Sequence, residues 1–150
     1  MSDIIIGRKA EQEILRQRIE SKSPELIVIY GRRRIGKTYL VRQYFNDTFS
    51  FYSTGIYQGT KKEQLGEFTR QLAHYSGRKW KVAKDWFDAF AQLREYLESI
   101  DGDNPIVVFP QTIFFHSKIR ERNFMRLCKK CSRFFFFVRE RESMNILKKH

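Results

Sequence analysis

The chain has 150 residues, with 29 Lys and Arg against 17 Asp and Glu, and so a formal net charge of +12. Its hydrophobic fraction of 41% is enough for one core and excludes an intrinsically disordered chain, while apolar runs of at most five residues exclude a membrane-spanning helix. The N-terminus lacks the basic segment followed by an apolar segment that marks a secretory signal. With only two cysteines we expect no disulfide framework, and so a cytoplasmic protein.

The first third of the chain predicts two helices and two strands around a loop. Apolar positions on one face favour a helix over 9–21. The continuous apolar run Leu26–Tyr30 is typical of a strand buried on both faces, as in a parallel sheet. A loop over 31–38 follows, then a helix over 39–45 and a second strand over 49–53.

The next part of the chain predicts two amphipathic helices and a third strand. Apolar side chains repeat every three or four residues over 60–75 and over 85–100. A turn follows at 101–105, and the apolar run Ile106–Phe109 is again typical of a buried strand. This alternation of strands and helices predicts an α/β fold with a parallel sheet flanked by helices.

The loop between the first strand and the next helix contains a phosphate-binding pattern. Its residues fit G-x-x-x-x-G-K-[ST]: Gly31, Arg32, Arg33, Arg34, Ile35, Gly36, Lys37 and Thr38. The glycines let the backbone curve around a phosphate with its N–H groups inward, and the following helix adds its positive end. Lys37 would reach the β- and γ-phosphates, and the Thr38 hydroxyl would coordinate Mg²⁺.

The three adjacent arginines of this loop allow a second interpretation. Arg32, Arg33 and Arg34 could contact the phosphates of DNA or RNA. The alternative function is therefore a basic nucleic-acid-binding protein in which the loop pattern is incidental. Within a nucleotide-binding loop, the same arginines would flank the site or face solvent.

Two segments together resemble a known family. Ile6–Glu11, followed one helix later by Ile29–Thr38, resembles the archaeal-type ATPases of the P-loop AAA+/STAND-like group, which open with Gly-Arg-x-x-Glu and favour Gly-Arg-Arg-Arg in the P-loop. The resemblance covers about residues 3–109. It implies a P-loop NTPase-type sheet and binding of ATP with Mg²⁺, and it would place Gly7 and Arg8 near the adenine.

The family pattern stops after the third predicted strand. In this group, Asp-Glu follows the apolar run of a second core strand, where the Asp binds the Mg²⁺ shell and the Glu polarises the attacking water. Here Pro110 follows instead, and no acid lies between Asp103 and Glu121. The resemblance implies an ATPase, but the catalytic acids of that family are absent directly after Phe109. We therefore expect ATP to be bound better than it is hydrolysed.

The composition changes at the same point. Residues 110–150 carry 11 basic and 3 acidic side chains, seven of the fourteen phenylalanines and no glycine, whereas 1–109 carry 18 basic and 14 acidic side chains. We interpret 1–109 as the N-terminal part of a P-loop ATPase domain. Residues 110–150 are then an irregular, basic and aromatic tail that is not family sequence. A frameshift in the gene would produce such a tail, and it would truncate the domain and leave its sheet incomplete.

The tail allows other interpretations. Cys128 and Cys131 form one C-x-x-C pair, and without a second pair they do not predict a zinc site. The mixture of arginines with Phe134–Phe137 could bind single-stranded nucleic acid or an anionic membrane surface. An incomplete sheet would also expose a strand edge, which favours self-association or a protein partner.

Overall fold

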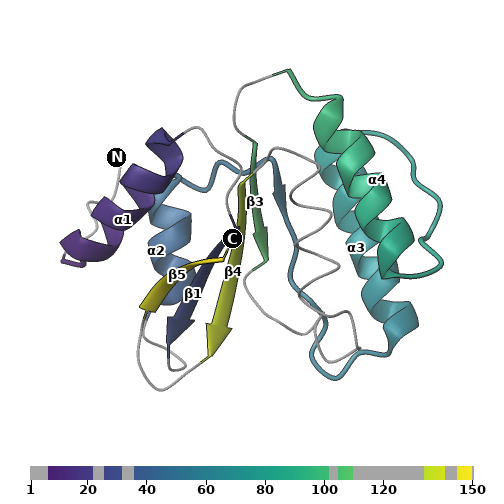
Figure 1. The fold of residues 1–150 in the computed structure, drawn as a ribbon. Helices are drawn as coiled ribbons and strands as arrows, with labels where there is room; N and C mark the ends of the chain where they lie inside the picture. The colour runs from purple at the N-terminus through teal and green to yellow at the C-terminus, as the bar shows by residue number, and fades with distance from the viewer. Residues whose placement is uncertain are drawn as a thin grey trace.

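The structure, a computed structural model, describes residues 7–21, 26–31, 36–101, 105–109, 134–140 and 145–149. Within these ranges the fold is mixed α/β, with four helices and one sheet (Figure 1). The helices are α1 (Lys9–Glu20), α2 (Lys37–Tyr44), α3 (Lys61–Ser76) and α4 (Trp86–Glu98). The strands are β1 (Leu26–Gly31), β2 (Phe51–Tyr52), β3 (Ile106–Phe109), β4 (Phe134–Glu140) and β5 (Asn145–Lys149).

The strand order is β2-β3-β4-β1-β5, so β4 lies between β1 and β3. The pairs β2–β3, β3–β4 and β1–β4 are parallel, and β5 is antiparallel to β1. In this register Phe109 is the partner of Phe137, and Gly31 is the partner of Glu140. The carboxyl ends of β1, β3 and β4 therefore meet at one edge of the sheet.

One expectation about the sheet is wrong, and another is confirmed in part. The tail is not irregular over 134–140 and 145–149, where it forms β4 and β5. Phe134–Val138 is a continuous apolar run, which is the pattern of a strand in a parallel sheet that is covered on both faces. The predicted parallel pairing holds for β1, β2, β3 and β4, whereas β5 is antiparallel to β1. Only residues 141–144 join β4 to β5, and a parallel connection needs a crossover of a dozen residues or more.

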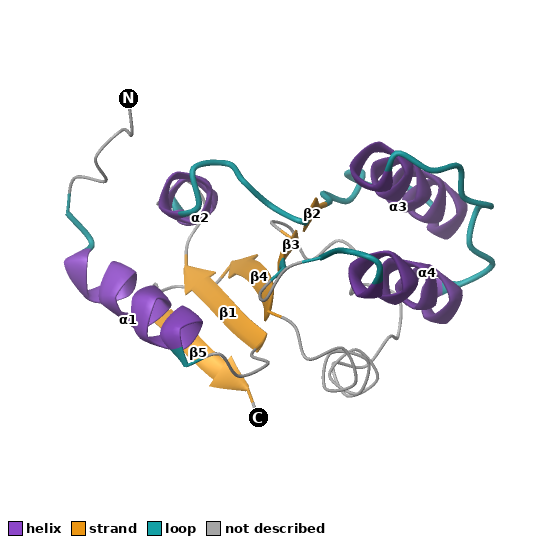
Figure 2. Ribbon diagram, turned by 90° about the horizontal axis from the view of Figure 1, so that it is seen from above, coloured by secondary structure: helices purple, strands orange, loops and turns teal. Residues whose placement is uncertain are grey.

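Helices cover both faces of the sheet, as Figure 2 shows from above, with α1 and α2 on one side and α3 and α4 on the other. Successive residues of β3 accordingly contribute to different cores. Val107 and Phe109 belong to the larger core cluster with α3 and α4, whereas Val108 joins Leu15 of α1 and Leu40 of α2. This alternation is the two-residue period of a strand. It explains why β3 is apolar throughout.

Phe68 of α3 lies at the centre of the larger core cluster. It is fully buried, and its ring centroid lies 5.2 Å from that of Phe51 and 5.7 Å from that of Phe90. The Trp86 ring is at 5.8 Å in an edge-to-face arrangement, and the Phe109 ring is stacked at 6.4 Å. Such aromatic pairs add to the free energy gained by burial alone. Phe68 thus joins both helices to β2 and β3.

Side-chain caps define where the two helices of this core begin. The Thr60 hydroxyl accepts from the Glu63 N–H at 3.3 Å, and the Glu63 carboxylate accepts from the Thr60 N–H at 2.7 Å, which is a capping box. Asp85 caps α4 by accepting from the Asp88 N–H at 2.9 Å. The predicted helices over 60–75 and 85–100 are confirmed to within a few residues. None of the helices in the described part of the chain is long and apolar enough to cross a membrane.

We expect Phe68→Ala to lower the free energy of unfolding by about 3–5 kcal/mol, because it removes a buried ring and leaves a cavity among four aromatic neighbours. Denaturant unfolding followed by circular dichroism would measure this change. Phe87→Ala on α4 is the matched control, since that ring is 56% exposed and its loss should change stability by no more than about 0.5 kcal/mol. Equal losses in the two variants would contradict the central place of Phe68.

Candidate functional site at the carboxyl end of the first strand

Residues 31–38 connect the carboxyl end of β1 to the amino end of α2. Gly31 is the last residue of β1, and α2 begins at Lys37, two residues earlier than the sequence predicts. The segment 32–35, with its three arginines and Ile35, lies outside the described residues. In open α/β sheets, the crevice beyond the carboxyl ends of the parallel strands is the usual place for a ligand.

Gly36 is the turn residue that starts α2. Its φ of 81° and ψ of 25° are left-handed, a conformation that glycine adopts without the steric cost other residues incur. Its carbonyl accepts the Leu40 N–H at 2.8 Å, which closes the first helical turn. Gly36 has no side chain to cap this N-terminus, and no acid lies in the first turn of α2. The first N–H groups of α2 and the positive helix end therefore suit an anion such as phosphate.

Lys37 and Thr38 lie in the first turn of α2. The Lys37 side chain is only 7% exposed, and Thr38 is half-buried. Lysine is rarely buried to this extent, because its ammonium loses hydration. The sequence predicts Lys37 as a charge that reaches toward phosphates. In the structure Lys37 is the first residue of α2, which begins at the edge where β1 ends.

The structure brings Arg8 beside this turn. Arg8 is the N-cap of α1, and its Nη2 atom lies 3.9 Å from the point that a Cβ on Gly36 would occupy. Gln12 fixes the local chain by donating its Nε2 hydrogen to the Gly7 carbonyl at 2.8 Å. Gly7 itself has a φ of 83°, where glycine is again favoured. Arg8 and Gly36 are therefore neighbours, although a whole helix and a strand separate them in sequence.

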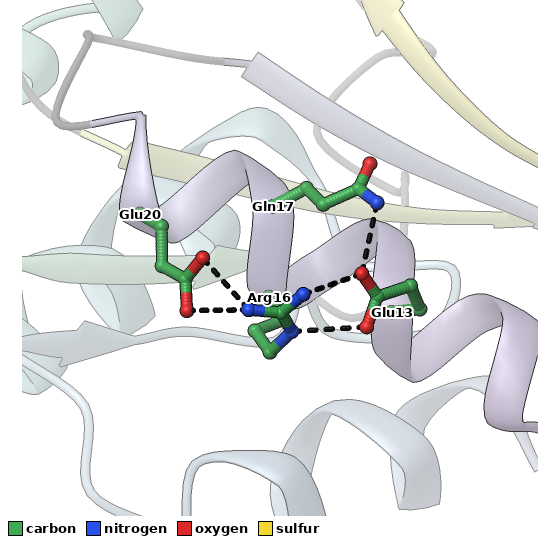
Figure 3. A network of polar contacts seen from close by, with 4 residues as sticks. All are labelled: Glu13, Arg16, Gln17 and Glu20. Atoms are coloured by element: carbon green, nitrogen blue, oxygen red, sulfur yellow. Dashed lines mark hydrogen bonds and ion pairs between the residues drawn. The ribbon is translucent and has the colours of Figure 1, made fainter.

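Apolar packing holds α1, the helix that follows Arg8, against α2, and ion pairs on its exposed face stabilise it. Leu15 is fully buried and belongs to the smaller core cluster with Leu40 and Val41 of α2. On the exposed face, Arg16 donates to Glu13 at 2.6 and 2.9 Å and to Glu20 at 2.8 Å (Figure 3). Pairs spaced three and four residues apart stabilise a helix in this way. The burial of Leu15 thus holds α1 against α2, and the ion pairs stabilise the helix itself.

These contacts shift the ionisation of the α1 side chains. Hydrogen bonds from Arg16, and then from Gln17 at 2.8 Å, lower the pKa of Glu13 from 4.5 to about 2. The pKa of Arg16 is raised by the hydrogen bonds to Glu13 and Glu20. A lowered carboxyl pKa means that the ion pair stabilises the fold above pH 4.5. The contribution is lost as the pH falls through 2.

The acids at this edge differ from the family pattern. The structure describes β3 only to Phe109, and Pro110 to Thr112 lie outside the described residues. On β4, Glu140 is the backbone partner of Gly31, the first residue of the loop. The sequence does not single out this acid, because the tail has no clear hydrophobic period. The apolar run Phe134–Val138, which leads directly to Arg139 and Glu140, was the available signal.

No group of three His, Cys, Asp or Glu side chains that could hold a metal ion occurs among the residues described by the structure. The sequence predicts the Thr38 hydroxyl as a ligand of Mg²⁺, and in the structure Thr38 is half-buried in the first turn of α2. Mg²⁺ commonly takes its ligands in this way, from substrate phosphates and water together with one or two protein groups.

Comparisons with known proteins give partial similarity. No protein-family model matches the chain. The chain is 28% identical over 123 residues to the uncharacterized protein MJECL04 of Methanocaldococcus jannaschii, across 77% of this chain and 27% of that protein. It is 36% identical over 44 residues to the uncharacterized ATP-binding protein MJ0423 of the same organism, across 29% of this chain and 75% of that protein. The chain thus spans 27% of the length of the first relative.

We expect Arg16→Gln to raise the pKa of Glu13 from about 2 toward 4.5, because its main hydrogen-bond donor is lost. Carboxyl chemical shifts followed by NMR through an acid titration would measure this. Lys61→Gln on α3 removes the same charge away from α1 and serves as the control. A Glu13 pKa that is the same in both variants would show that the pair seen in Figure 3 does not persist in solution.

Proposed function

We propose that this chain binds ATP as a P-loop NTPase-type α/β domain. The observation that carries the proposal is the left-handed Gly36 between the end of β1 and the start of α2, with Lys37 as the first helical residue. Backbone N–H groups, a helix N-terminus and a lysine thereby come together at one sheet edge, which is the combination that binds phosphate. The partial similarity to an archaeal protein described as ATP-binding supports it.

Each residue of the motif then has one task. The backbone N–H groups of residues 31–38, which include Arg32, Arg33, Arg34 and Ile35, would surround the phosphates. Lys37 would neutralise the β- and γ-phosphates, and Thr38 would coordinate Mg²⁺. When bound, Mg²⁺ would offset the phosphate charge. Gly7 and Arg8 would lie on the adenine side, and the 3.9 Å approach of Arg8 to Gly36 supports a place for them beside the loop.

A basic nucleic-acid-binding protein is the alternative, and the net charge of +12 is the observation in its favour. The run Phe134–Phe137, which the sequence also offered for binding single-stranded nucleic acid, belongs to β4 between β1 and β3. Counterion release makes phosphate-backbone binding fall steeply with salt. Binding to a single-stranded oligonucleotide that persists at moderate salt, with no binding of ATP, would favour the alternative.

We expect Lys37→Ala to weaken binding of a fluorescent ATP analogue by roughly tenfold to hundredfold, the equivalent of one charge-assisted hydrogen bond. Fluorescence anisotropy in the presence of Mg²⁺ would measure the dissociation constant. Lys62→Ala removes the same charge from an exposed position on α3 and is the matched control. If both variants bind the analogue as the parent does, the assignment of the loop is wrong.

Thr38→Ala should remove the gain in ATP affinity that Mg²⁺ produces, because the hydroxyl ligand is lost while the backbone loop remains. The same fluorescence titration, performed with Mg²⁺ and with a chelator, gives this ratio for each protein. Thr48→Ala is a suitable control, since Thr48 is exposed and lies after α2. An unchanged Mg²⁺ effect in Thr38→Ala would exclude the metal-ligand role of this hydroxyl.

A further inference from the structure

The segment 77–84, which joins α3 to α4, carries a concentration of positive charge. It contains Arg78, Lys79, Lys81 and Lys84 and no acid. The three lysines are exposed. Among the ion pairs formed by residues that the structure describes, none includes any of these lysines. The ammonium groups of the segment are therefore open to an anionic partner.

Contacts with the two helices fix the backbone of this segment. Trp80 packs against the larger core cluster, and the Gln92 side chain donates to the Lys81 carbonyl at 3.1 Å. Ala83 is buried, and its N–H donates to the Thr69 hydroxyl at 3.5 Å. The exposed side chains between these anchors are thus displayed from a fixed backbone. Binding through them costs less conformational entropy than binding through a free loop.

Two apolar side chains are exposed among the lysines. Val82 is 54% exposed, and Phe87 in the first turn of α4 is 56% exposed. Their neighbours Ala83 and Trp86 are buried, so Val82 and Phe87 point away from the core. In Figure 2 the segment runs along the side of α3 and α4 that is turned away from the sheet. We call this outer region the α3–α4 surface, and it consists of Lys79, Lys81, Val82, Lys84 and Phe87.

The acids close to this surface in sequence serve the start of α4. Asp85 accepts the Asp88 N–H at 2.9 Å, and Asp88 accepts the Lys84 N–H at 3.0 Å. Both acids are half-buried, whereas the three lysines are exposed. Arg78 lies 3.8 Å from Glu95, so this pair is nearly neutral to an approaching partner. The outermost charges of the α3–α4 surface are therefore positive.

The two apolar side chains indicate which kind of anion the surface fits. A nucleic acid gains from the stacking of its bases on aromatic rings, to which Phe87 can contribute but Val82 cannot. A bilayer interface accepts aliphatic and aromatic side chains alike. Lysine stems extend along apolar surface there, while their ammonium groups stay with the headgroups. An anionic lipid surface thus uses both the charge and the apolar groups.

We propose that the α3–α4 surface docks the chain on a membrane leaflet that contains anionic lipids. Val82 and Phe87 enter the headgroup region, and the three lysines attract the lipid headgroups. Neither ATP nor the loop that follows β1 takes part, so the inference is independent of the proposed function. The net charge of +12 adds a long-range attraction to the same leaflet, and the α3–α4 surface determines how the chain is oriented on it.

The test uses the full chain and vesicles of phosphatidylcholine, either alone or with an equal part of phosphatidylglycerol. Sedimentation gives the lipid concentration at which half of the protein is bound. The charge variant combines Lys79→Gln, Lys81→Gln and Lys84→Gln. The apolar variant combines Val82→Ser and Phe87→Ser, and leaves the charge unchanged.

Two matched control variants remove the same chemistry from other places. Lys9→Gln, Lys61→Gln and Lys62→Gln together remove three exposed lysines from α1 and the first turn of α3. Ile56→Ser and Tyr57→Ser together remove a β-branched and an aromatic side chain that are exposed in the loop after β2. These controls separate the position of the groups from their charge and hydrophobicity.

We expect the parent to bind the vesicles that contain phosphatidylglycerol and not those of phosphatidylcholine alone. The charge variant should need on the order of a hundredfold more lipid, since each lysine near an anionic surface contributes about fivefold. The apolar variant should need roughly tenfold more lipid, because two half-exposed side chains lose their burial in the interface. Both control variants should bind within about twofold of the parent at 0.1 M salt, where charges outside the contact are screened.

Several outcomes would overturn the inference. A parent that binds neither kind of vesicle does so directly. A charge variant that matches the three-lysine control shows attraction by net charge alone, and an apolar variant that matches its own control shows that no side chain inserts. Labelled poly-glutamate and a labelled single-stranded oligonucleotide are titrated with the same proteins. If either probe depends on both sets of residues while vesicle binding depends on neither, the surface belongs to an acidic protein or to a nucleic acid instead.

Discussion

The register of β4 between β1 and β3 is the constraint on which the rest of the structure depends. A shift of β3 by one residue would exchange the faces of Val107 and Val108, and so move each of them into the wrong core. Both cores therefore select the same alignment. The register of β4 with β1 brings Gly31 level with the end of β4, and so defines the edge at which residues 31–38 begin.

The helices on the two faces of the sheet form two different core clusters. On one face, α3 and α4 form a large aromatic cluster that is built around Phe68 and that includes none of the loop residues described by the structure. On the other face, the smaller cluster joins Leu15 of α1 to Leu40 and Val41 of α2. The elements that follow Arg8 and Gly36 are thus packed directly on each other. The position of Arg8 beside the loop is a consequence of apolar packing further along both helices.

Local signals in the sequence were sufficient for α1, α3, α4 and β3, because periodic apolar positions, helix caps and a β-branched run are all contained in short segments. The phosphate-binding pattern likewise placed Gly36 and Lys37 at a strand-to-helix turn. The order of the strands is different, since it depends on pairing between distant segments. Phe134–Phe137 therefore gave no sign that β4 lies beside β1, and the partnership of Glu140 with Gly31 could not be foreseen. The approach of Arg8 to Gly36 is also a tertiary contact. The sequence indicated both residues as parts of a nucleotide site, but not that they are neighbours.

Both neighbours of β1 come from the far end of the chain, and this has a consequence for synthesis. Leu26 pairs with Phe135 and with Lys149, the second of which is made 123 residues later. During translation, α3 and α4 can pack together while β1 still has two unpaired edges. Pairing across such long loops is slow, and exposed strand edges invite aggregation until it is complete. The segment 31–38, although it leaves the ribosome early, acquires its supporting strands last.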